Sequence, residues 1–306
     1  MATRKLVLFV LAACTKITAA IPSGRDTNDL ASRIDPHLAY VTYFAAHTSA
    51  NASVSQCTMV CSWATSVRRA VGEFCSVILL TDQISGFELP CLHLRVEVFR
   101  APVNKSLINL AKFNAYEHFL RQVSEPINIV AMDTDMLLLR DLSFRFNKDF
   151  DLGLTWTRPS VPSKHFKYMP VNAGIMYISG RGQVGEKIFQ HLAELFLQHH
   201  AEDLWWGDQL VLRRILGRRR IPDRITTTFQ VQYAKSGDPK QFHLCFFPAA
   251  FDNHNPPLKL TQKRVNVVHF KGATKHLMGS YLKKIVSGRP LPMAPQFAIR
   301  KFRTSG

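Results

Sequence analysis

The amino-acid sequence predicts an α/β fold, in which helices cover both faces of a mostly parallel central sheet. Strand-like and helix-like segments alternate from residue 38 onward, which is typical of parallel strands joined by helices. Two strand-like segments, 75–80 and 127–132, are continuous apolar runs, as expected for strands buried on both faces. The 306 residues are 46% hydrophobic and 20% charged, so the chain can bury the core of one such domain.

The first half of the chain is expected to be Rossmann-like. In the segment 57–74, apolar residues recur at helical spacing and Arg68 and Arg69 fall on the polar side. The segment 94–99 alternates between apolar and polar residues, which favours a strand near a sheet edge. The predicted elements are a strand at 38–44, a helix at 57–74, strands at 75–80 and 94–99, a helix at 107–120 and a strand at 127–132.

The second half is expected to extend the same sheet, so that residues 38–285 form a single domain. The segment 184–199 has the strongest helical pattern of this half. The predicted elements are strands at 150–156 and 171–178, helices at 184–199 and 208–215, and short strands at 244–247 and 265–270. Residues 286–306 form a basic, proline-containing tail, for which no structure is predicted.

Residues 1–20 resemble a targeting signal. Arg4 and Lys5 precede a short apolar run, and small residues follow it. The run is about half of the 20 or so apolar residues that a bilayer span needs, which favours a cleaved signal peptide over a short signal anchor. The sequons at Asn51 and Asn104 agree with that route. We therefore expect a protein of the secretory pathway, in the Golgi or endoplasmic reticulum lumen, or a secreted one.

The formal net charge of +17 raises the question of an anionic partner. A basic chain suggests nucleic acid, but a secretory signal argues against it, and no nucleic-acid partner is expected. The densest basic run extends from Arg213 to Arg220. We favour a solvated helix end and loop for this run, and contact with a membrane surface or an anionic glycan is the alternative.

Five cysteines remain beyond the targeting segment: Cys57, Cys61, Cys75, Cys91 and Cys245. Because this number is odd, at least one thiol lies outside any disulfide within the chain. Cys57 and Cys61 are one helical turn apart, so they are expected to share a buried face. No pair has the spacing of a zinc site. Most are expected to be small buried residues, and one disulfide is compatible with the compartment.

The residues that indicate chemistry are Asp133, Thr134 and Asp135, which follow the strand at 127–132. In an extended chain, residues i and i+2 point to the same side, so both carboxylates can reach one cation. Carboxylate oxygens suit Mg²⁺ and Mn²⁺, and these cations also bind phosphate oxygens. Ligands of open α/β sheets bind at the carboxyl ends of the strands, which is where this acidic pair falls. The sequence therefore predicts a site for a divalent metal and a phosphate group.

Four segments stand in a fixed order along the chain. They are Ile129 to Leu142, Val171-Asn172-Ala173-Gly174-Ile175-Met176-Tyr177, Gly207-Asp208-Gln209-Leu210, and His269-Phe270-Lys271-Gly272-Ala273-Thr274-Lys275. In this order they resemble segments of GT-A-type glycosyltransferases, in particular the glycogenin-like family 8, in which the first of them binds the metal. The resemblance extends over about residues 38–285. It implies a GT-A-like fold with a nucleotide-sugar-binding half (38–142) and an acceptor half (143–285).

The resemblance implies a metal-dependent, retaining transferase that moves a sugar from a nucleoside-diphosphate sugar, UDP-linked in the first instance, to a glycan or protein acceptor. Mn²⁺ (or Mg²⁺) would be held by Asp133, Asp135 and His269. The group beneath the anomeric carbon would be Asp208 or Gln209. The residues assigned to the donor or the substrate are Thr42, Lys112, Asn172, Gly272 and Lys275.

Several assignments have structural alternatives. Asp208 could cap the helix it begins, Lys112 could be a solvated helix residue, and His269 could be a hydrogen-bonded core histidine. Trp205 and Trp206 suit either a sugar ring or the core. Asp141 is interpreted as a helix cap or turn residue outside the site.

The sequence leaves two rival functions open. A phosphatase of the haloacid-dehalogenase type also has two aspartates after a strand, but it favours Thr or Val where Leu137 stands. The second rival is a secreted carbohydrate-binding protein that uses the transferase fold without catalysis. The complete set of Asp133, Asp135 and His269 argues against that loss of catalysis.

Overall fold

The computed structural model of the chain describes residues 38–45, 54–85, 91–104, 107–123, 125–156, 171–181, 184–199, 207–216, 229–235, 238–256 and 265–288. The strands are β1 (Leu38–Tyr43), β2 (Ser76–Asp82), β3 (Val96–Ala101), β4 (Asn128–Met132), β5 (Met136–Leu138), β6 (Leu152–Trp156), β7 (Val171–Ile178), β8 (Phe229–Lys235), β9 (Asp238–Pro248) and β10 (Val267–His269). The helices are α3 (Val54–Val71), α4 (Ile108–Gln122), α6 (Gly185–His199), α7 (Gly207–Leu216), α8 (Ala249–Asp252) and α9 (Met278–Ser287), and the short 3-10 helices are η1 (Leu92–Leu94), η2 (Ser143–Asn147) and η3 (Gly272–Leu277).

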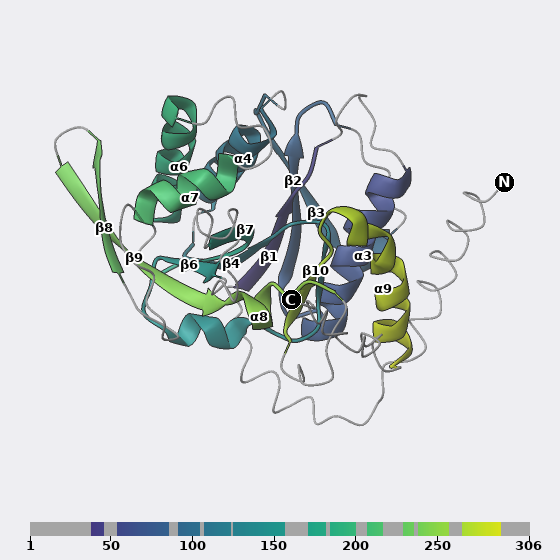
Figure 1. Ribbon diagram of the computed structural model, residues 1–306. Coiled ribbons are helices and arrows are strands. Elements are labelled where there is room, and N and C mark those ends of the chain that lie inside the picture. Colours follow the sequence, from purple (N-terminus) through teal and green to yellow (C-terminus); the bar gives the residue numbers. More distant parts are fainter. Residues whose placement is uncertain are drawn as a thin grey trace, which may run out of the picture.

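The central sheet has eight strands in the order β3-β2-β1-β4-β7-β6-β9-β8 among the described residues (Figure 1). Strands β3, β2, β1 and β4 pair in parallel. Strand β7 runs antiparallel between β4 and β6, and β8 runs antiparallel to β9. Since β6 and β9 again pair in parallel, most strands point the same way, and the predicted mostly parallel α/β sheet is confirmed.

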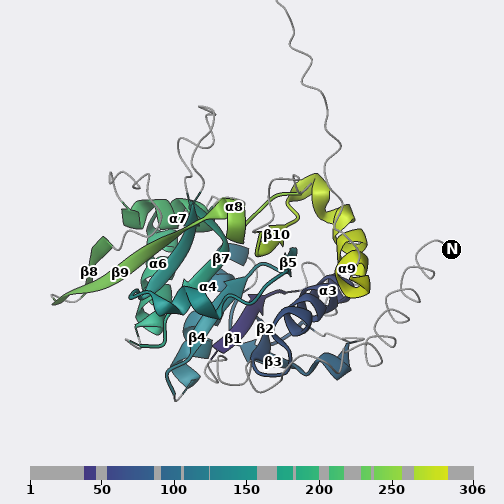
Figure 2. The ribbon, with the colours of Figure 1, turned by 90° about the horizontal axis from the view of Figure 1, so that it is seen from below.

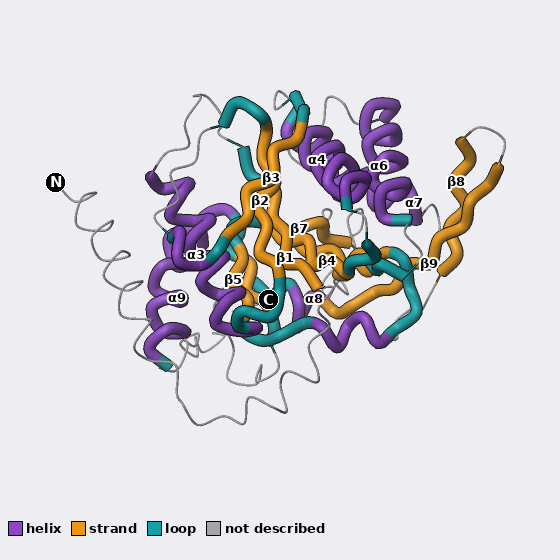
Figure 3. The backbone as a smooth tube through the Cα atoms, turned by 180° about the vertical axis from the view of Figure 1, so that it is seen from behind, coloured by secondary structure: helices purple, strands orange, loops and turns teal. Residues whose placement is uncertain are grey.

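Helices cover both faces of this sheet, as predicted. Side chains of β1 alternate between two cores: Leu38 and Tyr40 pack into one, and Ala39 and Val41 into the other, because successive residues of a strand point to opposite faces. Helices α3 and α9 lie over the first face and α4, α6 and α7 over the second, in the views of Figures 1 and 2. Figure 3 shows the same layers from behind.

Helix α3 illustrates how the apolar pattern positions an element. The residues predicted to face the core, from Cys57 to Val71, are buried. Phe74, which was predicted to continue this stripe, is 51% exposed. That part of the prediction is wrong because the helix ends at Val71 and the chain turns at Gly72, where φ is +82°, a conformation that favours glycine.

The strand at 265–270 also differs from its prediction. It was expected to extend the central sheet, but β10 pairs antiparallel with β5 in a separate two-stranded sheet. Strand β5 begins only a few residues after β4, so a tight turn at Thr134 takes the chain away from the central sheet. Strand β3, by contrast, is an edge strand of the central sheet, as its alternating pattern predicted. Strand β8 and most of β9 were not predicted, and they form a hairpin that extends away from the helices (Figure 1).

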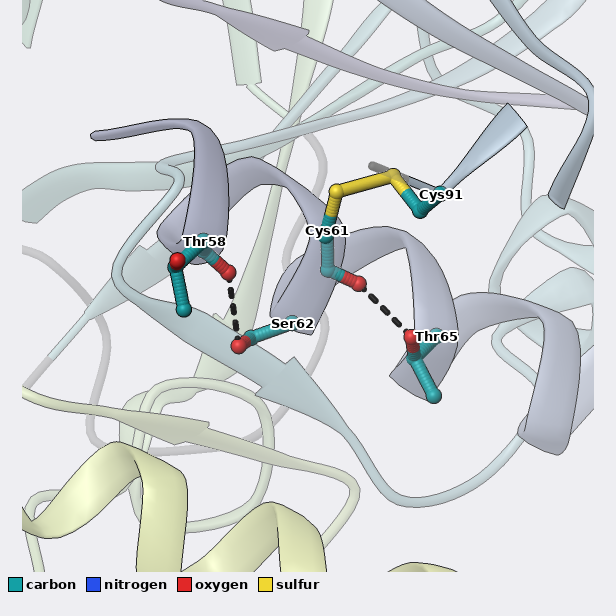
Figure 4. Close-up of a disulfide and its surroundings, with 5 residues drawn as sticks. All are labelled: Thr58, Cys61, Ser62, Thr65 and Cys91. Carbon is teal, nitrogen blue, oxygen red and sulfur yellow. Dashed lines mark hydrogen bonds between the residues drawn. A yellow bond between two sulfur atoms is a disulfide. The ribbon is translucent and has the colours of Figure 1, made fainter. Parts of the chain in front are cut away.

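A disulfide joins Cys61 of α3 to Cys91, which precedes η1 (Figure 4). Cys57, Cys75 and Cys245 are buried outside this disulfide, so both the single disulfide and the buried thiols agree with the sequence analysis. Beside Cys61, the hydroxyls of Ser62 and Thr65 donate to carbonyls one turn back on α3, at 2.8 and 2.7 Å. These bonds satisfy the polar groups that the helix buries.

Several predictions fall on residues outside the described part of the chain. They concern the targeting segment 1–20, the sequon at Asn51, Trp205 and Trp206, and most of the tail. The sequon residue Asn104 is described and is exposed after β3. Within the described residues, no helix combines the length and apolar character that crossing a membrane requires.

Candidate metal and nucleotide-sugar site

The sequence motifs meet at the carboxyl ends of the parallel strands in the middle of the sheet. Strands β1 and β4 are parallel, and Thr42 pairs with Met132, the residue before Asp133. Strand β7 is antiparallel to β4, so its beginning lies at the same end of the sheet, and the Asp133 amide donates to the Gly174 carbonyl at 2.8 Å. In open α/β sheets, ligands bind at the carboxyl ends of the strands. The strand order thus explains why motifs far apart in the sequence share one location.

Asp133, Asp135 and His269 form a compact cluster. One potential ligand atom from each lies within 4.8 Å of the others. His269 Nε2 is 3.1 Å from Asp135 Oδ1 and 3.8 Å from Asp133 Oδ2. The Asp135 and His269 side chains are buried, whereas that of Asp133 is 33% exposed. One side of the cluster is therefore open to a ligand.

The pairing of β5 with β10 brings His269 to the two aspartates. His269 is opposite Met136 in this pair, and the Phe270 amide donates to the Asp135 carbonyl at 2.8 Å. Gly174 leaves room for the imidazole, since a Cβ there would lie 2.5 Å from His269 Cε1 and 2.6 Å from Met136 Cε. The close approach explains why the segment after Asn172 needs glycine at this position.

The cluster suits a divalent metal ion. Two carboxylates and an imidazole are ligands for Mn²⁺, and the imidazole makes the set less suited to Mg²⁺. Asp135 Oδ1 is buried and accepts no regular hydrogen bond from the described residues. A buried carboxylate oxygen without such a donor carries a desolvation cost, which coordination of a cation at this position would offset. The donor set and the burial thus both fit the predicted metal.

Lys112 lies beside this cluster and joins it to Asp208. Its ammonium group is 2.8 Å from Asp133 Oδ1 and 3.5 Å from Asp208 Oδ2, and it donates to the Ala173 carbonyl at 3.3 Å. Burial disfavours the charged lysine, but the charges of Asp133 and Asp208 outweigh that effect and raise the pKa of Lys112. Lys112 is consequently a buried cation between two site carboxylates, and the solvated alternative is wrong.

Asp208 is the second residue of α7, and its carboxylate is buried. Asp208 Oδ1 accepts a hydrogen bond from the backbone N–H of Gln209 at 2.8 Å. Burial raises the pKa of this carboxyl, while the charge of Lys112 lowers it and that of Asp133 raises it. The helix start and the salt bridge together hold the carboxylate in the site. Gln209 is half-buried next to it.

The last predicted motif contributes two lysines. Lys275 of η3 lies 2.9 Å from Asp135 Oδ2, and about half of its side chain is exposed. Burial raises the pKa of Asp135, but the imidazolium form of His269 and the ammonium of Lys275 outweigh it and lower the pKa to about 2. The half-buried Lys271 has its pKa lowered by burial, although Asp133, Asp135 and Asp208 act in the opposite direction. Gly272 lies between these lysines, is exposed and has φ of +51°, which the absence of a side chain permits.

Asn172 lies at the start of β7, next to the carboxyl end of β4, and its side-chain oxygen already accepts two hydrogen bonds. Asn172 Oδ1 accepts the Gly174 amide at 2.9 Å and Asn253 Nδ2 at 2.6 Å. Thr42 is fully buried, and its hydroxyl has no hydrogen-bond partner among the described residues. The binding roles of Thr42, Asn172 and Gly272 therefore stay predictions, although β1 and β7 place Thr42 and Asn172 beside β4 in the sheet.

Asp141 and Asn253 show what the sequence did and did not reveal. Asp141 accepts the Tyr40 hydroxyl and the Ser143 amide, each at 3.0 Å, so the turn interpretation is confirmed. Asn253 was not anticipated. It follows α8 and contacts His269 Nδ1 through Oδ1 at 2.8 Å. No local pattern around Asn253 predicts this contact, because its partners come from β6, β7 and β10.

Comparisons with known proteins identify the fold. Neither protein-family models nor curated proteins match the sequence. The glycosyltransferase GlyE of Streptococcus pneumoniae TIGR4 matches over 84% of this chain and 66% of its own, with 14% identity and a TM-score of 0.51. Its apo form matches over 82% and 62%, with 14% identity and a TM-score of 0.50. The galactosyltransferase LgtC, with donor and acceptor sugar analogues, matches over 84% and 98%, with 15% identity and a TM-score of 0.49.

This chain spans less than two thirds of the length of either GlyE chain. It has the GT-A fold of glycosyltransferases, as the resemblance of its motifs implied. The cluster of Asp133, Asp135 and His269 lies at the carboxyl ends of the parallel strands, where open α/β sheets bind their ligands.

Proposed function

We propose that the protein is a metal-dependent, retaining glycosyltransferase that transfers a sugar from a nucleoside-diphosphate sugar, UDP-linked in the first instance, to a glycan or protein acceptor. The observation that carries this proposal is the convergence of Asp133, Asp135 and His269 on one point beside the Lys112–Asp208 ion pair. These side chains supply metal ligands and a carboxylate for the reacting carbon in one place.

A divalent cation held by Asp133, Asp135 and His269 would supply Lewis-acid charge against the leaving diphosphate, and Mn²⁺ fits the mixed ligands better than Mg²⁺. Lys275 is positioned to add a second positive charge, because its side chain is about half exposed and its ammonium group contacts Asp135 at 2.9 Å. A phosphate group entering the site would meet this lysine and the exposed backbone at Gly272. Lys112 holds Asp133 and Asp208 in place and lowers the repulsion between them.

Asp208 or Gln209 would act beneath the anomeric carbon. A carboxylate or amide oxygen there steadies an oxocarbenium-like centre, as a nucleophile or as an electrostatic partner. Burial keeps the Asp208 carboxylate away from water, so its charge acts through a medium of low dielectric constant. Thr42 and Asn172 would contribute to binding the donor.

The proposal extends to the cellular location. The order of charged, apolar and small residues in 1–20 supports entry into the secretory pathway. The Cys61–Cys91 disulfide and the exposed sequon residue Asn104 are compatible with that compartment.

The test is Mn²⁺-dependent turnover of nucleotide sugars. Purified protein should hydrolyse or transfer from a UDP-sugar with Mn²⁺, and thermal-shift screening against UDP- and GDP-sugars should identify the donor. A ligand at 100 times its dissociation constant stabilises the folded state by about 2.7 kcal/mol. Asp135→Asn should abolish turnover, whereas Asp149→Asn, an exposed aspartate before β6, should leave it unchanged.

Equal turnover in both variants would reject the metal assignment. Binding of a sugar without any turnover, with or without metal, would instead favour the carbohydrate-binding alternative. Measuring both properties on the same preparation separates these outcomes.

A further inference from the structure

We infer that Asn253 is a positioning residue, which fixes the His269 imidazole with its proton on Nδ1 and its Nε2 lone pair toward Asp133 and Asp135. This inference rests on the proposed metal site. It assigns a role to a residue that lies outside every motif of the sequence. A chain of hydrogen bonds leads from the backbone amide of Gly174 to the His269 imidazole.

The first step concerns the Asn172 side chain. The Gly174 amide contacts Asn172 Oδ1 at 2.9 Å. A backbone N–H can only donate, so the atom that faces it must be an acceptor. The oxygen and nitrogen of an asparagine amide are assigned from such partners, and here the partner leaves one choice. Gly174 therefore fixes the orientation of Asn172.

The second step passes this orientation to Asn253. The atom of Asn253 that lies 2.6 Å from Asn172 Oδ1 must donate, since a carbonyl oxygen only accepts, and it is therefore Nδ2. The same Nδ2 contacts Thr155 Oγ1 at 3.0 Å. With Nδ2 directed toward β6 and β7, Asn253 Oδ1 must face the opposite way.

The third step reaches the imidazole. Asn253 Oδ1 is 2.8 Å from His269 Nδ1. An amide oxygen accepts only, so Nδ1 must carry the proton of this bond. In the neutral imidazole the other nitrogen, Nε2, then has a free lone pair. That lone pair faces Asp135 Oδ1 at 3.1 Å and Asp133 Oδ2 at 3.8 Å, an all-acceptor arrangement that a divalent cation would complete.

The backbone around Asn253 keeps this geometry rigid. The Asn253 amide donates to the Ala249 carbonyl of α8 at 2.9 Å. The next residue, His254, exchanges backbone bonds with β10: its amide donates to the Val267 carbonyl at 3.0 Å, and its carbonyl accepts the His269 amide at 2.8 Å. Asn253 is 5% exposed and His269 4%, so water does not compete with the side-chain bond. The segment after α8 and strand β10 thus hold the amide and the imidazole in register.

The tautomer can be measured directly. Long-range ¹H–¹⁵N spectra of the full-length protein, labelled with ¹⁵N-histidine and free of metal, distinguish the two ring nitrogens, and His269→Gln identifies the signals of His269. In the neutral form, His269 of the unsubstituted protein should be protonated at Nδ1. Asn253→Ala should lose this preference, because the substitution removes the acceptor of the Nδ1 proton. A neutral His269 imidazole that carries its proton on Nε2 in the unsubstituted protein would overturn the inference, whether or not Asn253→Ala folds.

The affinity for Mn²⁺ alone, measured by the electron paramagnetic resonance signal of free Mn²⁺, provides the second readout. Loss of a residue that orients a metal-binding histidine lowers metal affinity by about 10- to 100-fold, and we expect this loss in Asn253→Ala. Asn266→Ala is the matched control. Asn266 is buried to a similar extent and donates to Asp252 at 2.7 Å without contacting His269, so its affinity for Mn²⁺ should change less than about 3-fold.

A double-variant cycle tests whether Asn253 acts through His269. If it does, Asn253→Ala should have no further effect on Mn²⁺ affinity in a His269→Ala background. An undiminished effect there would overturn the inference while leaving the proposed function intact. If the unsubstituted protein binds no Mn²⁺, the proposed metal dependence fails, and the position of the proton on His269 still decides the inference.

Discussion

The ammonium group of Lys112 lies 2.8 Å from the carboxylate of Asp133, and this contact joins helix α4 to the metal cluster. The same ammonium is 3.5 Å from Asp208 Oδ2. The resemblance to family 8 implied that Lys112 binds the donor. In the structure, the Lys112 ammonium group contacts the carboxylates of Asp133 and Asp208. The positive charge of Lys112 therefore offsets the negative charge of these two residues.

Lys112→Met should destabilise the fold at neutral pH. Removing one partner of a buried ion pair costs about 3–5 kcal/mol, and the partial exposure of Asp133 should reduce this to about 2 kcal/mol. Denaturant unfolding at pH 7 measures the loss, with the exposed Lys148→Met as control. An equal effect of the two substitutions would contradict the buried bridge.

The pH dependence of the same variant has a definite sign. Burial raises the pKa of Asp208, and Lys112 opposes that rise, so the pKa should rise further in Lys112→Met. The folded state then binds more protons than the unfolded state, and stability increases as the pH falls. The deficit of Lys112→Met at pH 7 should therefore shrink between pH 7 and about pH 5. A deficit that grows on acidification would argue against a buried Asp208 carboxylate.

Gly174→Ala should weaken metal binding by displacing the His269 imidazole. The added Cβ would lie 2.5 Å from His269 Cε1 and 2.8 Å from Asn172 Oδ1, and contacts this short require a shift of the neighbouring atoms. We expect a loss of Mn²⁺ affinity of about 10-fold or more, measured by isothermal titration calorimetry. Gly279→Ala in α9 is the control, because its Cβ would meet nothing within 4 Å, and it should bind Mn²⁺ as the unsubstituted protein does.

These residues also indicate how far the sequence could predict the structure. Asp133 and Asp135 could be identified from the sequence, because two aspartates two positions apart after an apolar strand form a local pattern. The alternation of strands and helices likewise predicted the α/β sheet. Asn253 was not found, since its bond to Asn172 joins residues 81 positions apart and depends on the completed fold.

The course of the chain after Asp135 could not be predicted for the same reason. An apolar strand at 265–270 fits the central sheet as well as it fits β5. The short turn after β4 decides between them by directing β5 out of the central sheet. Pairing partners that are distant in sequence are fixed by packing, and apolar periodicity contains no information about which strand is the partner.

The Cys61–Cys91 disulfide should contribute substantially to stability. It closes a loop with a sequence separation of 30 residues, for which chain entropy gives about 3.6 kcal/mol. The double variant Cys61→Ala/Cys91→Ala should lose about this amount in denaturant unfolding. Cys57→Ala, which removes a buried sulfur one turn earlier on α3, should lose only about 1 kcal/mol. Equal losses would mean that the sulfur volume, and not the covalent link, stabilises this region.

Buried Cys75 should make stability fall at alkaline pH. Burial raises the pKa of its thiol to about 11, although Arg68 opposes this rise. An unfolded thiol titrates near pH 8.5, so above that pH the unfolded state loses a proton that the folded state keeps, and stability decreases as the pH rises. At pH 10 the effect is about 2 kcal/mol.

Cys75→Ala should therefore be less stable than the unsubstituted protein at pH 7, where the lost side-chain volume dominates. Its deficit should shrink by about 2 kcal/mol between pH 8 and pH 10. Val77→Ala removes volume from the same core without a titrating group, so its deficit should stay constant over this range. Parallel pH profiles for all three proteins would show that the Cys75 thiol is accessible to water.

Asp208→Asn should lower turnover far more than donor affinity. The substitution keeps the shape of the side chain and removes its charge, and that charge matters most when positive charge develops at the anomeric carbon. We expect kcat to fall by about 100- to 1000-fold while the KM for the UDP-sugar changes little. The fold should tolerate the change, because Lys112 keeps its 2.8 Å contact with Asp133 and burial already disfavours the charged carboxylate of Asp208.

Gln209→Ala separates the two candidates for the group beneath the anomeric carbon. The Gln209 side chain is half-buried next to Asp208, and both oxygens of Asp208 already have partners: the Gln209 amide at 2.8 Å and the Lys112 ammonium at 3.5 Å. If Gln209 supplies the oxygen, its variant should show the larger loss of kcat. In either case, NMR of the first-formed product should show the anomeric configuration of the donor. An inverted product would remove both residues from that position, since a group beneath the anomeric carbon would block the water or acceptor that inversion requires on that face.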